Sequence, residues 1–119
     1  MQTHEASVRG RAGSSPGFED ITAAVRSVVV QSDVRNGRVT VLRTDPGFSL
    51  CVNEWESGLL QDLASAIERL NGTRPSVGSS SLVLPLVEGD LRLGTWQRIV
   101  LVELERPCER EVVVQVLGE

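Results

Sequence analysis

The stretch that decides the fold is GTWQRIVLVE, residues 94–103, together with the closing run VVVQVLGE, residues 112–119. Each contains a block of β-branched and other apolar residues bounded by Gly, Pro or charged residues, a pattern typical of a β-strand. This pattern predicts strands over residues 97–103 and 111–117. Another strand is predicted over residues 82–87, before a Glu-Gly-Asp turn.

Two segments carry the one-sided apolar spacing of a helix. The first, over residues 21–32, follows Asp20 as a candidate cap and has four apolar residues on one face: Ile21, Val25, Val28 and Val29. The second, over residues 57–70, stops at Asn71-Gly72 and has five residues in a stripe expected to be buried: Leu59, Leu60, Leu63, Ile67 and Leu70.

The rest of the N-terminal half reads as strands and turns. A weak strand is expected over residues 3–9 and a Gly/Ser/Pro-rich loop over residues 11–17. Residues 39–52, broken by Asp-Pro-Gly, read as a hairpin. Since strands outnumber helices and the connections read as short hairpins, the sequence predicts an α+β fold. We expect an antiparallel or mixed sheet with two main helices.

Composition narrows the classes of function. At 119 residues and 40% hydrophobic content, the chain is expected to form one domain over residues 1–119. A net charge of −4 argues against nucleic acid as a partner, and the chain contains no Lys, which excludes a lysine Schiff base. Two cysteines, no apolar leader and no apolar run of membrane-spanning length favour a cytoplasmic protein that does not enter a membrane.

Four short motifs share one family pattern: GFEDIT at residues 17–22, Asn53-Glu54, Gly-Ser-Ser at residues 78–80, and the GTWQ that opens residues 94–103. In this order they resemble the YjbQ family, which is often labelled secondary thiamine-phosphate synthase. The resemblance covers residues 17–119. It implies an α+β fold with a sandwich-like sheet that assembles as a homotrimer.

The chain departs from the family where metal ligands would be expected. The family carries His-Thr-Thr before its Asn-Glu pair, and here those positions hold Asp45, Pro46 and Gly47. The single histidine is His4, expected near a frayed terminus. Because a metal site needs several convergent ligands, we expect no metal and no cofactor.

The resemblance implies a ligand-binding set of seven residues: Asn53, Glu54, Ser79, Ser80, Thr95, Gln97 and Glu103. For several of them a structural explanation competes. The Asn-Glu pair fits the first turn of a helix, where Asn caps and Glu meets the positive end of the dipole. Gly-Ser-Ser could bind an anion through its amides or be an ordinary loop. Trp96 fits a sheet surface or a subunit interface, and Glu103 is expected on a solvated strand face.

No catalytic residue is assigned, and two hypotheses remain. The first is a non-catalytic trimeric protein that has lost the histidine cluster and binds a partner or a small phosphorylated ligand. The alternative is an enzyme with weak thiamine-phosphate synthase activity, as the resemblance implies. That reaction displaces pyrophosphate and needs a metal or a basic clamp, neither of which the sequence visibly supplies.

Overall fold

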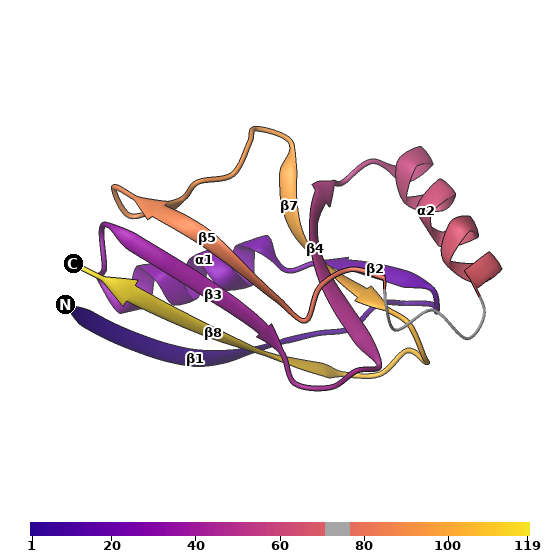
Figure 1. The fold of residues 1–119 in the computed structure, drawn as a ribbon, viewed down its shortest axis with the longest axis horizontal. Coiled ribbons are helices and arrows are strands. Elements are labelled where there is room, and N and C mark those ends of the chain that lie inside the picture. The colour runs from indigo at the N-terminus through magenta and orange to yellow at the C-terminus, as the bar shows by residue number, and fades with distance from the viewer. Residues whose placement is uncertain (71–76) are drawn as a thin grey trace.

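A computed structural model describes residues 1–70 and 77–119 (Figure 1). The expected helix stop at residues 71–72 and part of the small-residue loop that follows lie outside the described residues. The elements, in chain order, are β1 (Gln2–Gly10), β2 (Gly17–Asp20), α1 (Thr22–Ser32), β3 (Gly37–Arg43), β4 (Phe48–Glu54), α2 (Ser57–Leu70), β5 (Ser81–Val87), β6 (Asp90–Leu91), β7 (Gln97–Glu103) and β8 (Arg110–Gly118).

The strands form two sheets, and every strand pairing within the described residues is antiparallel. The larger sheet has the order β1-β8-β3-β5-β6 and the smaller one the order β2-β7-β4. Figure 1 shows both chain ends at one end of the larger sheet, far from α2. The α+β prediction is confirmed, and the sheets are antiparallel.

The expected hairpin over residues 39–52 is wrong. β3 pairs with β5 and β8 in the larger sheet, whereas β4 pairs with β7 in the smaller one. The segment between them carries the chain from one sheet to the other. Of the named pairings, only β5 with β6 joins strands that follow one another in sequence, so long-range pairing dominates the fold.

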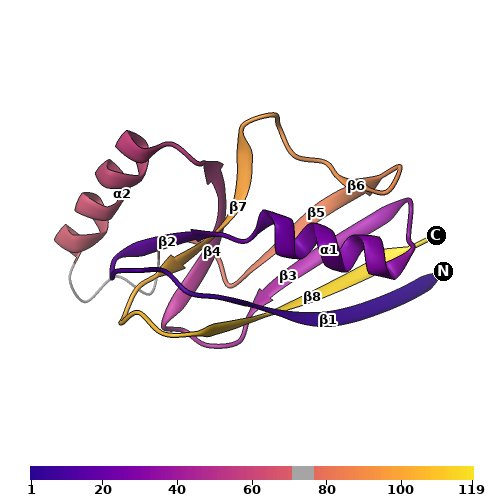
Figure 2. The ribbon, with the colours of Figure 1, turned by 180° about the vertical axis from the view of Figure 1, so that it is seen from behind.

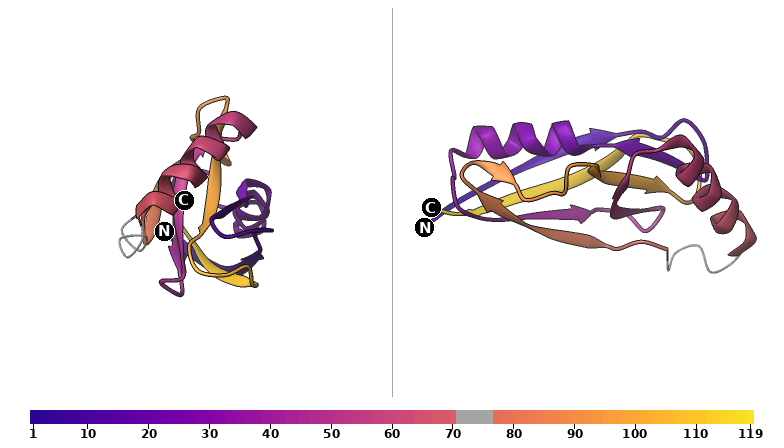
Figure 3. Two further views of the ribbon diagram at one scale, coloured as in Figure 1. Left: turned by 90° about the vertical axis from the view of Figure 1, so that its right-hand side faces the viewer. Right: turned by 90° about the horizontal axis from the view of Figure 1, so that it is seen from above.

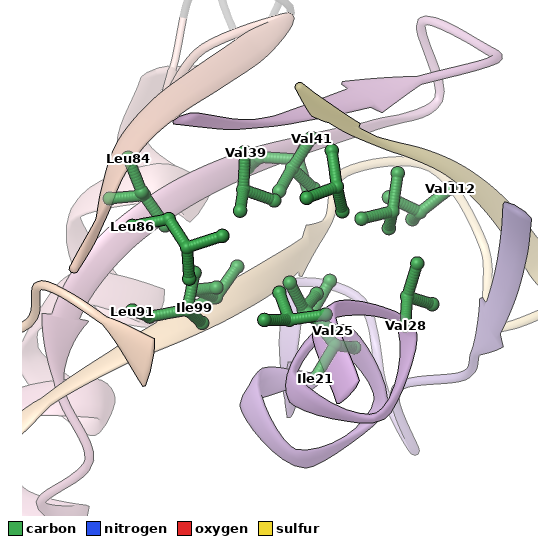
Figure 4. Packing of buried hydrophobic residues seen from close by; sticks show 14 of the residues in the cluster. Ile21, Val25, Val28, Val39, Val41, Leu84, Leu86, Leu91, Ile99 and Val112 are labelled. Atoms are coloured by element: carbon green, nitrogen blue, oxygen red, sulfur yellow. The ribbon is translucent and has the colours of Figure 1, made fainter. Parts of the chain in front are cut away.

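The main core lies between α1 and the larger sheet. Figures 2 and 3 show α1 lying along one face of this sheet, and Figure 4 shows the apolar face of α1 pointing at the valines of β3 and β8. The face predicted for this helix is confirmed, because Ile21, Val25, Val28 and Val29 are all buried. Alternate residues of β8 bury their side chains against α1; they are Val112, Val114 and Val116.

β7 is buried on both faces, which explains its uninterrupted apolar run. Ile99 and Leu101 belong to the main core, whereas Val100 and Val102 form a second cluster with Ile67 of α2. The smaller sheet is therefore the middle layer between the main core and α2.

α2 spans the residues that the sequence predicts, but its stripe is not buried as expected. Ile67 is fully buried and Leu63 is half-buried, while Leu59 and Leu70 are 40% and 43% exposed. The described chain therefore leaves an apolar face of α2 open to solvent. No helix in the described part of the chain has the length and apolar character needed to cross a membrane.

Candidate functional site

Four of the seven expected ligand-binding residues lie together at one end of the smaller sheet. Glu54 ends β4 and pairs with Gln97, which begins β7, and Asn53 precedes Glu54. Thr95 belongs to a turn in which the Gln97 amide donates to the Gly94 carbonyl, at 3.0 Å. The Gln97 side chain closes the same turn, since its Oε1 accepts from the Gly94 N–H at 2.7 Å.

This turn and the link between β4 and α2 border an open pocket of about 540 Å³. Its lining residues are Glu54, Trp55, Glu56, Trp96 and Arg98. Trp55 is 45% exposed and Trp96 is 74% exposed, so the two indoles offer apolar surface to solvent. Sequence reasoning did not single out Trp55 or Glu56, although both directly follow the Asn-Glu pair.

Glu56, not the Asn-Glu pair, caps α2. Its carboxylate accepts from the Gly58 and Leu59 amides at 2.9 and 2.8 Å, and its carbonyl accepts from the Leu60 amide. The hydrogen bonds from Gly58 and then Leu59 lower the pKa of Glu56. Asn53 instead accepts the Glu54 amide through its own Oδ1, at 2.9 Å. Glu54 lies before the helix, and no hydrogen bond reaches its carboxylate from the part of the chain that the structure describes.

Of the residues that the structure describes, Arg98 is the one cation in the pocket lining, and Asp20 is its partner. The Arg98 Nε lies 3.6 Å from the Asp20 Oδ2. The other oxygen of Asp20 accepts from the Thr22 amide and hydroxyl, at 3.0 and 2.6 Å. Ile21, not Asp20, occupies the N-cap position of α1, so the predicted cap is wrong; Asp20 instead binds the first residue of the helix and also offsets the charge of Arg98.

Ser79 and Ser80 lie apart from this pocket, opposite the middle of β4. Ser79 and Leu50 exchange both backbone hydrogen bonds, at 2.8 and 2.9 Å, and the Ser80 carbonyl accepts the Arg43 amide. The Ser79 amide is therefore not free for an anion in this conformation. Gly78 precedes them with a φ of 76°, where an added Cβ would meet the Ser49 side chain.

Glu103 lies at the other end of β7, about 20 Å from Gln97 along the strand. It is fully buried, so its expected place on a solvated face is wrong. Arg110 at the start of β8 binds both its carboxylate oxygens, at 2.9 and 2.7 Å, and the Glu105 amide donates to one of them at 3.1 Å. These hydrogen bonds, which the guanidinium donates to the Glu103 carboxylate, raise the pKa of Arg110 above its ordinary value. A single chain thus does not bring the seven residues together, and their shared role stays a prediction.

The residues that the sequence offers as candidate metal ligands, Asp45 and His4, have other structural roles. Asp45, where the resemblance would place a family histidine, accepts from the Gly47 amide and from Arg110, at 2.6 and 3.3 Å. His4 lies within β1 opposite Val116, so the expected frayed terminus is wrong. Among residues 1–70 and 77–119, no three His, Cys, Asp or Glu side chains gather where they could hold a metal ion.

Comparisons with known proteins agree with this fold. The model of the UPF0047 protein YjbQ-like family matches residues 6–76 and 72–119. A UPF0047 protein of Methanothermobacter thermautotrophicus is 31% identical over 84% of this chain and 82% of its own length. One of Archaeoglobus fulgidus is 32% identical over 82% of this chain and 89% of its own length.

Solved structures are similar throughout the chain. A YbjQ-like protein of unknown function from Sulfolobus solfataricus superposes with a TM-score of 0.89 at 27% identity, over 99% of both chains. A hypothetical protein from Aeropyrum pernix reaches 0.90 at 29% identity, over 100% of both chains. With a family model that matches nearly its whole length, this chain belongs to the UPF0047, YjbQ-like family.

Proposed function

We propose that this protein is a non-catalytic binding protein that works as a homotrimer and takes a small phosphorylated ligand. The observation that carries the proposal is the apolar surface, uncovered in the described chain, that the exposed part of the α2 stripe and the two exposed tryptophans form, with an open pocket at the tryptophans. Large exposed apolar groups of this kind usually mark an interaction site. We place the protein in the cytoplasm, which its two unpaired cysteines favour.

A second apolar surface favours a closed ring of copies rather than a two-fold symmetric dimer. On the outer face of the larger sheet, Leu42 of β3 and Val83 and Val87 of β5 are 44%, 61% and 39% exposed. This face is opposite the one that α1 covers. A head-to-tail ring needs two different surfaces on each copy, and here the α2 stripe of one copy can meet the sheet face of the next. The number three comes from the family resemblance.

The oligomer is tested by light scattering on the purified protein. A trimer mass is expected for the wild type, and a monomer would overturn the assembly. Leu59→Glu on α2 and Val83→Glu on β5 should each break the ring, because each puts a charge into one of its two surfaces. Both residues are exposed in the single chain, so folding should survive. Ser65→Glu adds the same charge on the polar side of α2 and should leave the mass unchanged.

The chemistry of the pocket supports binding over catalysis. The carboxylate of Glu56 is held by the start of α2, so Glu54 is the lining carboxylate that no hydrogen bond from the described residues occupies. Displacing pyrophosphate calls for several positive charges around the leaving group. Among the described residues, Arg98 is the only cation in the pocket lining, and it has Asp20 beside it.

The alternative, a weak thiamine-phosphate synthase, rests on the family label and on Glu54 as a base. The decisive assay measures thiamine phosphate formed from the pyrimidine pyrophosphate and the thiazole phosphate, by wild type and Glu54→Gln. We expect neither protein to exceed the reaction without enzyme. Turnover by the wild type that Glu54→Gln abolishes would overturn the non-catalytic proposal. Native mass spectrometry of the purified protein tests the other part, since a phosphorylated compound should co-purify.

A further inference from the structure

We infer that the pocket lined by Trp55, Trp96 and Glu54 binds a compact organic cation of the quaternary-ammonium type. This inference rests on the proposed binding function and specifies the part of the ligand that enters this pocket: a cationic group, with the phosphate held outside the negatively charged lining. Three features of the lining support it: its aromatic content, its charge and the donors and acceptors it offers.

The chain concentrates its indoles at this one place. It has two tryptophans and no tyrosine, and both tryptophans line the pocket from different segments. Trp55 follows β4 and Trp96 lies in the turn before β7, and both are well exposed. The face of an indole carries negative electrostatic potential and attracts cations more strongly than other aromatic side chains do.

The charge of the lining has the matching sign. Arg98 is offset by Asp20 at 3.6 Å, and Glu56 faces the amides that begin α2. Glu54 is left as the charge with no partner in the described residues. The unbalanced charge at the pocket is therefore negative, which favours a cationic ligand.

The available groups favour a cation without N–H donors. Indoles offer no hydrogen-bond acceptor, and one free carboxylate cannot satisfy the several donors of a primary ammonium or the coordination shell of a metal ion. A quaternary ammonium has no N–H donor to satisfy and needs no coordinating oxygen atoms, because aromatic faces and overall charge bind it. A pocket of about 540 Å³ lies within the range of small-molecule sites.

The two indole N–H groups provide the test, since each gives one side-chain signal in a proton–nitrogen NMR spectrum. We titrate tetramethylammonium chloride at constant ionic strength and expect both indole signals to shift together, with a dissociation constant on the order of millimolar. The neutral analogue 2,2-dimethylpropan-1-ol, which has the same branched shape with one added hydroxyl, should bind at least about tenfold more weakly. Equal shifts from both compounds, or shifts from neither, would overturn the inference.

Single substitutions test which residues bind tetramethylammonium. Trp96→Leu should weaken binding about tenfold, measured on the remaining Trp55 signal. Glu54→Gln should weaken it about fivefold. The matched control Glu5→Gln removes an exposed carboxylate on β1 of the other sheet and should change nothing. An equal loss in Glu5→Gln would show that net charge, not the pocket, attracts the cation, and would refute the assignment.

The two proposals can fail separately. If a phosphorylated compound co-purifies but tetramethylammonium leaves both indoles unmoved, the cation inference fails and the proposed function stands. If the cation binds but the protein is a monomer with no co-purifying ligand, the cation site stands and the proposed function fails.

Discussion

Replacing Arg110 with Met should destabilise the protein more than any loss of a surface ion pair. Arg110 and Glu103 have side chains that are 8% and 0% exposed, joined by two hydrogen bonds at 2.9 and 2.7 Å. The guanidinium also contacts the Gly47 carbonyl at 3.4 Å and lies 5.5 Å from the centre of the Phe48 ring. Its removal leaves a buried carboxylate whose remaining donor, among the described residues, is the Glu105 amide.

Breaking a buried ion pair from one side typically costs about 3–5 kcal/mol. We expect the lower end, about 3 kcal/mol, because one amide donor remains. For a domain of this size, that loss lowers the unfolding midpoint by roughly 10–15 °C.

Urea unfolding followed by far-ultraviolet circular dichroism, at one fixed protein concentration, measures the change. Arg9→Met is the matched control, since Arg9 and Glu109 form an exposed pair that should contribute little. The double variant Glu103→Leu, Arg110→Met removes both charges and should recover most of the lost free energy of unfolding. Equal losses for Arg110→Met and Arg9→Met, or a double variant no more stable than Arg110→Met, would refute the reasoning.

Three further predictions concern a thiol, a helix cap and metal content. In Cys108→Ser the remaining thiol, Cys51, should react slowly with Ellman's reagent until the protein is unfolded, because burial raises the pKa of Cys51 above its usual 9.0. The contribution of the protonated Cys51 to stability is therefore complete below pH 9. It is lost as the pH rises through the pKa that Cys51 has in the folded protein. Glu56→Gln should lower the melting temperature above pH 5 and Glu68→Gln should not. The lowered pKa of Glu56 means that its contribution is lost below about pH 4.5, so the variant and wild type should converge in acid. Elemental analysis after dialysis should find no stoichiometric transition metal, and stoichiometric zinc would contradict that expectation.

The sequence by itself determined the helices and strands that a periodic or apolar pattern in neighbouring residues marks. The bounds of α2 were predicted to the residue, and the apolar face of α1 was predicted correctly, because both follow from a repeat of 3.6 residues. β7 was also placed correctly from its apolar run. Four residues of the expected ligand set do meet at one end of the smaller sheet, because they lie where β4 ends and β7 begins.

Only the tertiary structure decided which strands pair and which charges are buried. β3 and β4 read as a hairpin but join different sheets, and β2 escaped notice because four residues carry too little periodicity. Glu103 has the spacing of a solvated residue, yet Arg110 from the next strand holds it in the interior. Local patterns report a residue's own conformation, whereas pairing, burial and a pocket assembled from separate segments depend on which distant parts of the chain give the best packing together.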